Sequence, residues 1–147
     1  MRKISKSLKD TKNIAKEAIK IISKDSLKDK ALILGLYGDL GAGKTAFTQA
    51  LAKHLGVKDK VTSPTFVIMK KYKIQDTKYK NLIHIDAYRL NKGNELSKLG
   101  WADIITDPKN LVLIEWPEKV KDIMPASYHK IKIKHLDETS REFEICS

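Results

Sequence analysis

Residues 31–56 read ALILGLYGDLGAGKTAFTQALAKHLG, and this stretch decides the fold of the chain. It starts with an apolar run of strand type, passes through a glycine-rich turn, and continues as a helical pattern from Lys44 to about Leu55 that Gly56 ends. The turn fits the pattern G-x-x-x-x-G-K-S/T of a phosphate-binding loop, or P-loop. The fixed positions of that pattern are Gly38, Gly43, Lys44 and Thr45. Because strand, loop and helix stand in the required order, the sequence predicts a P-loop.

The chemistry of such a loop indicates what it binds. Its glycines allow successive backbone N–H groups to surround phosphate oxygens, and the N-terminus of the following helix adds partial positive charge. We expect Lys44 to reach the β- and γ-phosphates of a nucleotide and the hydroxyl of Thr45 to ligate Mg²⁺. The loop therefore predicts a nucleoside di- or triphosphate together with Mg²⁺.

Two further apolar runs each end in a carboxylate. NLIHID (81–86) ends at Asp86 and NLVLIE (110–115) ends at Glu115, and both are typical of strands buried on two faces of a parallel sheet. Because parallel strands bring their C-terminal ends to one crevice, we expect both carboxylates beside the P-loop, at Mg²⁺ or at the attacking water. Taken singly, each carboxylate has an alternative role, which is to cap the turn after its strand. Thr65, in TSPTF, is a candidate for the γ-phosphate or Mg²⁺, although Ser-Pro is also an ordinary turn signal.

The remaining patterns indicate an α/β fold, a P-loop NTPase-like three-layer sandwich whose central sheet is mostly parallel with an antiparallel edge. Residues 12–24 place lysines on one face and apolar side chains on the other, which is typical of an amphipathic helix. TFVIMKKY (65–72) resembles a less buried strand, and HKIKIKH (129–135) with REFEI (141–145) an antiparallel pair at a sheet edge. With no repeat or linker visible, residues 1–147 are expected to form a single P-loop ATPase domain.

Composition bounds the partners and the compartment. The net charge of +11 and the pI of about 9.6 are compatible with RNA binding, but only three of the 29 basic residues are arginine and the lysines are scattered, so a lysine-biased composition is the alternative. The single cysteine, Cys146, has no partner for an intramolecular bridge, which favours a reducing compartment. No apolar run approaches the roughly 20 residues that span a bilayer, so we expect a soluble cytoplasmic protein without membrane contact.

Four motifs stand in one order along the chain: YGDLGAGKT (37–45), SPTF (63–66), HIDAYRL (84–90) and IEWP (114–117), with NELSKLG (94–100) between the last two. With this set the chain resembles the TsaE (YjeE-type) family of small P-loop ATPases, from Thr11 to the C-terminal strands. The resemblance implies ATP or ADP with Mg²⁺ as the cofactors. The resemblance implies a role in making the threonylcarbamoyl adenosine beside the anticodon of tRNAs. It also implies two partners, a transferase subunit and its paralogous partner, with nucleotide-driven assembly as the task and direct contact with tRNA left open.

The resemblance also assigns a candidate site. It makes residues 39–45 the phosphate loop, Thr45 and Glu115 the Mg²⁺ ligands, and Asp86 a carboxylate that acts at the γ-phosphate or its water. Thr11 matches a threonine near the nucleotide base, with a helix N-cap as the alternative, and Trp116 follows the metal carboxylate, with core packing as the alternative. The catalytic candidates are Lys44, Asp86 and Glu115. The candidates for cofactor binding are Thr11, Asp39, Leu40, Gly41, Ala42, Gly43, Lys44, Thr45, Ala46, Thr65, Arg89 and Trp116.

One position departs from the family, because Ala46 stands where a threonine is usually repeated; its backbone N–H can still meet an α-phosphate oxygen. Of the three arginines, Arg2 precedes the first helix and Arg141 lies on the expected hairpin, so Arg89 is the best-placed cation beyond the P-loop. If Arg89 faces a partner instead, hydrolysis is slow in the isolated chain and depends on the complex.

Rival classes leave other signatures. A GTPase needs N-K-x-D and D-x-x-G motifs, which the chain lacks. A small-molecule P-loop kinase normally clamps its phosphates with arginines, and a nucleotide-gated RNA-binding module fits the charge. The last two remain the alternatives to an ATPase that serves tRNA modification.

Overall fold

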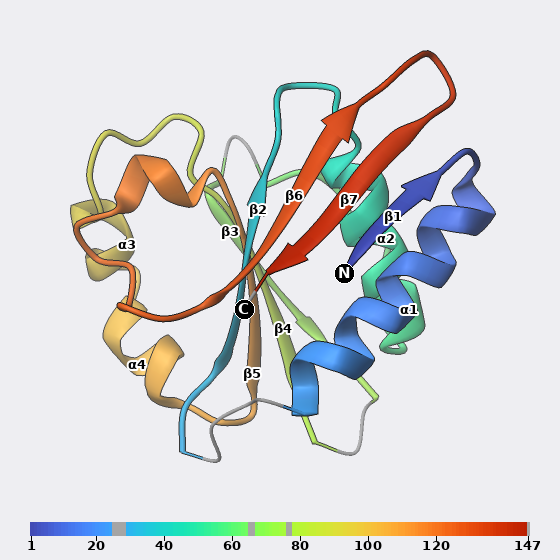
Figure 1. Cartoon of the computed structure of the whole chain (residues 1–147). Coiled ribbons are helices and arrows are strands. Elements are labelled where there is room, and N and C mark those ends of the chain that lie inside the picture. The colour runs from blue at the N-terminus through green and yellow to red at the C-terminus, as the bar shows by residue number, and fades with distance from the viewer. Residues whose placement is uncertain (25–28, 65–66, 76–77, 147) are drawn as a thin grey trace.

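The centre of the sheet comes from the apolar runs that end beside the glycine-rich turn. In the computed structural model, which describes residues 1–24, 29–64, 67–75 and 78–146, seven strands form one sheet in the order β1-β7-β6-β2-β5-β4-β3 (Figure 1). The strands are β1 (Arg2–Ser5), β2 (Leu32–Tyr37), β3 (Met69–Lys73), β4 (Asn81–Asp86), β5 (Asn110–Glu115), β6 (His129–His135) and β7 (Arg141–Cys146). The helices are α1 (Leu8–Lys24), α2 (Lys44–His54), α3 (Asn94–Lys98) and α4 (Trp101–Thr106), with the 3-10 helix η1 (Pro117–Val120).

The pairing of the strands confirms the predicted fold class. Strands β6, β2, β5 and β4 run parallel, β7 pairs antiparallel with β6, and β3 pairs antiparallel with β4. Every residue of β4 and β5 is buried, as expected for strands that are covered on both faces. The sheet is therefore mostly parallel at its centre and antiparallel at its edges.

Two details at the edges correct the sequence prediction. The β6–β7 pair is not the edge itself, because β1 lies outside β7 in antiparallel register from Arg2 opposite Glu144 to Ser5 opposite Arg141. In β1 only Ser5 is buried, so no alternation of apolar residues marks this strand in the sequence. Strand β3 begins at Met69, and Val67 and Ile68 of the predicted strand precede it in a turn, where the amides of both donate to the carbonyl of Pro64. Residues 65 and 66 lie outside the described residues.

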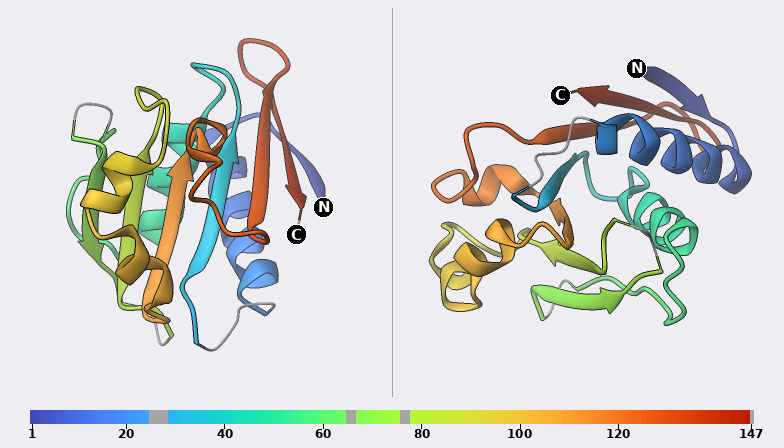
Figure 2. Two further views of the ribbon diagram at one scale, coloured as in Figure 1. Left: turned by 90° about the vertical axis from the view of Figure 1, so that its left-hand side faces the viewer. Right: turned by 90° about the horizontal axis from the view of Figure 1, so that it is seen from below.

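Helices cover both faces of the sheet (Figure 2), and alternate residues of the central strands therefore face opposite layers. One face, with Leu34, Leu82 and Leu113, packs in a core cluster with apolar residues of α1 and α2. The other face, with Ile33, Ile83 and Val112, packs with residues of α3, α4 and η1. This arrangement of helices on both sides of one sheet is the predicted three-layer sandwich.

Helix α1 has the two faces that its sequence predicts. Its buried residues are Thr11, Ile14, Ala15, Ala18, Ile19 and Ile22, and Lys12, Lys16, Lys20 and Lys24 are exposed. The hydroxyl of Ser7 accepts a hydrogen bond from the Asp10 amide at 3.1 Å, and the carboxylate of Asp10 accepts one from the Lys6 amide at 2.9 Å. These two hydrogen bonds fix the start of the helix.

The register of the sheet brings the strand ends together. Glu115 lies opposite Leu36 on one side and opposite Asp86 on the other. The C-terminal ends of β2, β5 and β4 therefore lie side by side, at the end of the sheet where the glycine-rich loop leads into α2. No helix in the described ranges has the length and apolar character needed to cross a membrane.

Candidate functional site

The loop between β2 and α2 depends on its glycines at two positions. Gly43 has φ +110°, in the left-handed region that side chains rarely adopt, and it forms the N-cap of α2. A Cβ placed on Gly38 would lie 2.7 Å from the carbonyl oxygen of Ile133, so the start of the loop runs against the backbone of β6. The glycines thus let the loop turn tightly between two strands and a helix.

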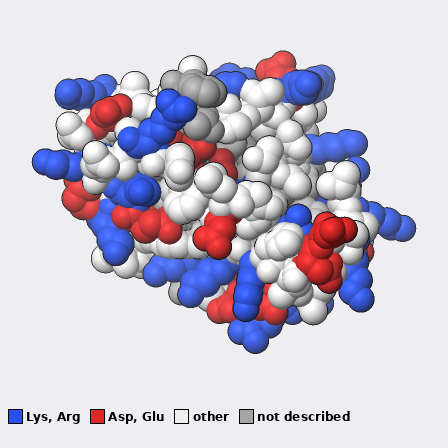
Figure 3. Space-filling view, turned by 90° about the horizontal axis from the view of Figure 1, so that it is seen from above, with Lys and Arg blue, Asp and Glu red and all other residues white. Residues whose placement is uncertain are grey.

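A cavity of about 320 Å³ opens between this loop and the ends of β4 and β5. It is lined by Leu40, Gly41, Gly43, Lys44, Thr45, Ser63, Asp86, Tyr88, Glu115 and Trp116. Figure 3 shows this end of the molecule from above. Lys and Arg side chains surround most of the outline of this face, with Asp and Glu side chains between them. Except for Ser63 and Tyr88, the lining residues are candidates that the sequence analysis selects, and the fold brings them together.

Lys44 is held inside the cavity by two contacts. Its Nζ donates a hydrogen bond to the carbonyl of Gly38 at 2.5 Å and lies 3.6 Å from the centroid of the Trp116 ring. The side chain is only 6% exposed. Burial lowers the pKa of Lys44 below its usual value, and attraction to Glu115 and Asp86 opposes part of this effect.

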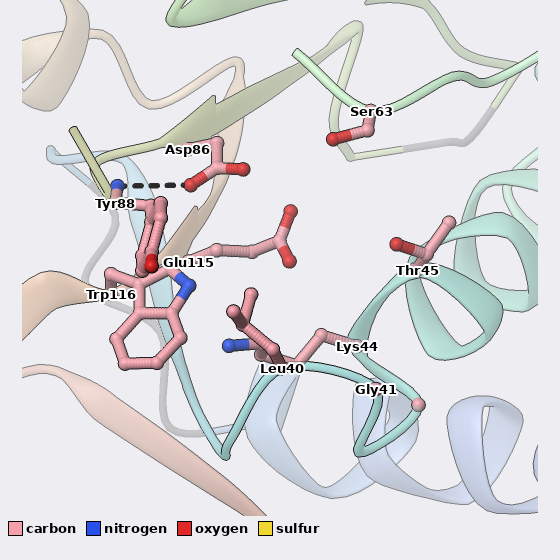
Figure 4. Close-up of a pocket in the computed structure, with 10 residues that line it drawn as sticks. Leu40, Gly41, Lys44, Thr45, Ser63, Asp86, Tyr88, Glu115 and Trp116 are labelled. Atoms are coloured by element: carbon pink, nitrogen blue, oxygen red, sulfur yellow. Dashed lines mark hydrogen bonds between the residues drawn. The ribbon is translucent and has the colours of Figure 1, made fainter. Parts of the chain in front are cut away.

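Asp86 and Glu115 bring two buried carboxylates to the cavity, 7% and 4% exposed. One oxygen of Asp86 accepts a hydrogen bond from the Tyr88 amide at 3.0 Å, so Asp86 also caps the turn that follows β4. Figure 4 shows the other oxygen of Asp86 directed toward the cavity. An oxygen of Glu115 is bonded to Nε2 of His84 at 2.8 Å. The two carboxylates therefore project into the cavity from neighbouring strands.

The oxygen donors of this cavity fit Mg²⁺. Figure 4 shows the hydroxyl of Thr45 and the carboxylate of Glu115 facing each other across the cavity, with Ser63 and Asp86 on a third side. Mg²⁺ prefers hard oxygen ligands, and in nucleotide sites it takes one or two from the protein and the others from phosphates and water. Thr45 and Glu115 are the residues that would hold it.

Trp116 has an unusual backbone conformation directly after Glu115. Its φ of 60° lies in the left-handed region, which costs a residue with a side chain about 1 kcal/mol or more. The half-buried ring packs against the ring of Tyr88, with centroids 5.1 Å apart, and lies over Lys44. Trp116 therefore contributes both to packing and to the lining of the cavity.

A second hollow of about 280 Å³ lies on the other side of the α2 N-terminus. Its lining includes Thr11, Gly43, Ala46 and Arg141. Thr11 lies inside α1 and not at its N-cap, and its hydroxyl is hydrogen-bonded to that of Ser5 at 2.7 Å. A Cβ placed on Gly43 would lie 3.8 Å from the side chain of Arg141, so this arginine borders the loop.

The structure places Arg89 and Arg141 differently with respect to the two hollows. Arg89 is exposed in the turn after β4 and is not among the residues that line either hollow. Arg141 is the arginine beside the loop, because the antiparallel pairing of β7 with β6 brings the start of β7 to this end of the sheet. A one-dimensional pattern does not contain that pairing.

The other candidates are placed as follows. Asp39 is exposed and Ala42 is buried, and the amide of Ala42 donates to the carbonyl of Asp39 at 3.0 Å within the loop. Thr65 lies outside the described residues. Sequence reasoning passed over Ser63, His84 and Tyr88 as individual residues, although the motifs SPTF and HIDAYRL contain them.

Comparison with known proteins identifies the family of the chain. The sequence model of the family described as "Threonylcarbamoyl adenosine biosynthesis protein TsaE" matches residues 5–143. The chain is 37% identical to the tRNA threonylcarbamoyladenosine biosynthesis protein TsaE of Rickettsia prowazekii, over 96% of this chain and 89% of that protein. It is 35% identical to the protein of the same name from Haemophilus influenzae, over 80% and 71% of the two chains. The crystal structure of Bacillus subtilis YdiB superposes with a TM-score of 0.69 at 29% identity, covering 97% of this chain and 82% of that chain. The chain thus belongs to the TsaE family, which takes part in the biosynthesis of threonylcarbamoyladenosine in tRNA.

Proposed function

We propose that this chain binds and hydrolyses ATP with Mg²⁺ in the cavity between the P-loop and the ends of β4 and β5. We further propose that its nucleotide state controls assembly with the transferase subunit and its paralogous partner in threonylcarbamoyladenosine synthesis. The observation that carries the proposal is the convergence of Lys44, Thr45, Asp86 and Glu115 on one cavity at the N-terminus of α2. A cation, a hydroxyl and two carboxylates are the groups that phosphoryl chemistry requires.

The P-loop side of the cavity provides for phosphate. Backbone amides of the loop and the N-terminus of α2 favour phosphate oxygens. Lys44 leaves its contacts with Gly38 and Trp116 to reach the β- and γ-phosphates, because a phosphate is a stronger partner for an ammonium group than a carbonyl or a ring. Thr45 and Glu115 would hold Mg²⁺, which would supply positive charge to offset the charge that develops on the phosphates.

The opposite wall provides for the nucleophile. In hydrolysis, a water oxygen bonds to the γ-phosphorus while the bond from that phosphorus to the bridging oxygen breaks, which gives ADP and phosphate. The oxygen of Asp86 that faces the cavity accepts a hydrogen bond from this water and orients it. Asp86 keeps its own position because the Tyr88 amide holds the other oxygen.

The second hollow suits the base and sugar of the nucleotide. It lies beside Gly43 and Ala46, where the chain passes from loop to helix, and Thr11 supplies a hydroxyl to its wall. The guanidinium plane of Arg141 can stack on an aromatic base or pair with the α-phosphate. Both contacts involve parts of the nucleotide, the base and the α-phosphate, that ATP and ADP have in common.

The described lining of the catalytic cavity includes Lys44 as a cation but no arginine. An added arginine stabilises the charge on the transferring phosphoryl group and is worth about 10³-fold or more in rate. The isolated chain should therefore hydrolyse ATP slowly, and a partner that completes the site should raise the rate. Arg89, exposed beside the cavity residue Tyr88, is positioned to meet such a partner.

Nucleotide binding is tested with a fluorescent ATP analogue, with and without Mg²⁺, on the wild-type chain and on Lys44→Ala. Loss of a charge-assisted contact worth about 1.5–3 kcal/mol should weaken binding by about 10- to 150-fold. Lys53→Ala is the matched control, because Lys53 is an exposed lysine on the same helix. Wild-type affinity in Lys44→Ala, with both variants folded by circular dichroism, would exclude the P-loop assignment.

Coupling is tested by steady-state phosphate release from the chain alone and after addition of the transferase subunit and its partner. We expect slow release alone and faster release in the mixture, together with ATP-dependent retention of the two partners in a pull-down. Release near the ~10 s⁻¹ that is typical of enzymes, unchanged by the partners, would instead favour an autonomous ATPase or a small-molecule kinase.

A further inference from the structure

A buried hydrogen bond connects His84 to Glu115, with 2.8 Å between Nε2 of the histidine and Oε2 of the glutamate. The two side chains are almost fully enclosed, at 1% and 5% exposed. They lie on the same face of the sheet, since His84 precedes Asp86 by two residues on β4 and Asp86 lies opposite Glu115. An ionised carboxylate can only accept, so Nε2 carries the hydrogen and donates it.

Packing alone does not account for a histidine at this position. Leu82, two residues earlier on the same face, and Leu113, directly opposite His84 on β5, are fully buried apolar residues. An imidazole in such surroundings costs free energy unless its polar atoms are hydrogen-bonded. Nδ1 of His84 is buried and has no hydrogen-bond partner in the described ranges, so the contact with Glu115 is the one that compensates for the buried ring.

The hydrogen bond constrains a side chain that has another attractive neighbour. Glu115 raises the pKa of Lys44 by electrostatic attraction, yet among the described residues the hydrogen bond that Glu115 forms is with His84 and not with Lys44. Figure 4 shows the carboxylate of Glu115 directed across the cavity toward Thr45. With one oxygen held by His84, Glu115 keeps this direction and does not turn to Lys44.

From these contacts we infer that His84 is a positioning residue for metal binding: it fixes the carboxylate of Glu115 in the direction from which Glu115 and Thr45 hold Mg²⁺. The inference rests on the proposed function. Groups that orient a metal ligand in this way typically contribute 10- to 100-fold to metal affinity. In this arrangement His84 touches neither nucleotide nor metal. Replacing it should therefore change how nucleotide binding depends on Mg²⁺ and leave the affinity for nucleotide without Mg²⁺ unchanged.

The test measures binding of a fluorescent ATP analogue across a Mg²⁺ titration, and again in excess EDTA. His84→Phe keeps a planar ring but removes the donor, and it should raise the Mg²⁺ concentration at half-effect by about 10-fold or more. Its affinity in EDTA should stay within about twofold of wild type, a change of about 0.4 kcal/mol. His84→Gln, which retains an N–H donor, should restore most of the Mg²⁺ dependence, and His84→Asn, one methylene shorter, should restore less.

Two controls separate positioning from packing. Leu82→Val disturbs the same face of β4 without touching Glu115, so it should lower the melting temperature and leave the Mg²⁺ midpoint unchanged. In a Glu115→Gln background, His84→Phe should produce no further shift of the midpoint. If His84→Phe does not fold, the difference in Mg²⁺ midpoint between His84→Gln and His84→Asn tests the inference.

Three results would overturn the inference: an unchanged midpoint in His84→Phe, equal midpoints for the Gln and Asn variants, or a full additional shift in the Glu115→Gln background. Failure of the proposed function gives a different result. In that case the wild-type chain itself binds the nucleotide without any dependence on Mg²⁺, or does not bind it.

Discussion

The ammonium group of Lys44 lies over the ring of Trp116, 3.6 Å from its centroid, and Trp116 holds this place with a left-handed backbone. The lysine is thus kept within the cavity by an aromatic ring and by the carbonyl of Gly38. Binding of phosphate has to draw Lys44 away from both. This competition between ring and phosphate makes the indole a reporter of the site.

We expect the fluorescence of Trp116 to change when ATP or ADP is added, because the cation that lies on its ring moves to the phosphates. The chain has two tryptophans, and Trp101 is a natural control, since its ring is buried and its Nε1 donates to the carbonyl of Ile123. Trp116→Phe should lose the change and Trp101→Phe should keep it. A response that survives in Trp116→Phe would contradict the contact.

Nucleotide affinity should fall with pH in the alkaline range, beginning below the ordinary lysine value of 10.5. Burial lowers the pKa of Lys44, so the free protein loses this proton early, whereas phosphate binds the protonated form. Binding above the lowered pKa should therefore take up a proton, which calorimetry in buffers of different ionisation enthalpy measures. Lys44→Arg should show no proton uptake, because a guanidinium stays charged.

The same shift has a defined effect on stability. Between the lowered pKa of Lys44 and 10.5, the unfolded chain binds more protons than the native one. The free energy of unfolding contributed by this residue therefore rises with pH in that window. The difference in free energy of unfolding between wild type and Lys44→Met, measured by chemical denaturation, should rise with pH across this window, because other groups that titrate there act alike in both proteins. A difference that falls with pH would mean that folding favours the charged form of Lys44.

The two carboxylates should separate in their effects. Glu115→Gln should weaken Mg²⁺-dependent nucleotide binding, whereas Asp86→Asn should leave affinity nearly unchanged and lower turnover, since its remaining oxygen can still accept from the Tyr88 amide. Titrations with and without Mg²⁺, combined with single-turnover hydrolysis, distinguish the two cases. The reverse pattern would show that the two roles are exchanged.

The arginines should separate as well. Arg141→Ala should weaken ATP and ADP equally, by about 2- to 30-fold for a cation–π contact of roughly 0.5–2 kcal/mol, because Arg141 borders the second hollow. Arg89→Ala should leave affinity unchanged and remove the stimulation of hydrolysis by the partners. Arg2→Ala is the control, since Arg2 pairs with Glu144 on the outer strands. Loss of stimulation in Arg141→Ala with intact affinity would reverse the assignment.

Local sequence patterns predicted the centre of this fold because the decisive information is local there. β4 and β5 are continuous apolar runs, and the glycine-rich turn must join a strand to a helix. The edges were harder to predict. β1 is a short, charged strand whose pairing with β7 connects distant parts of the chain, and no periodicity records such a contact.

The candidate site divides in the same way. Lys44, Thr45, Asp86 and Glu115 stand at strand ends or in a fixed motif, so their meeting follows from parallel topology. Arg141 reaches the loop only through the pairing of β7 with β6. The role of His84 depends on its hydrogen bond to Glu115 on the neighbouring strand. A histidine inside an apolar strand is nevertheless a signal that sequence reasoning can use, because a buried polar group requires a partner.

The β1–β7 pair joins residues that lie more than a hundred positions apart, as the Arg2–Glu144 separation of 142 illustrates. Ser5 and Thr11 on one side of the second hollow therefore meet Arg141 only after this long loop has closed. Opening of β1 alone would dismantle that hollow while the P-loop, held between β2 and α2, kept its shape. We therefore expect the wall formed by Ser5 and Thr11 and the loop to belong to different cooperative units. Amide hydrogen exchange should then be faster in β1 than in β2, and nucleotide should slow the exchange of β1.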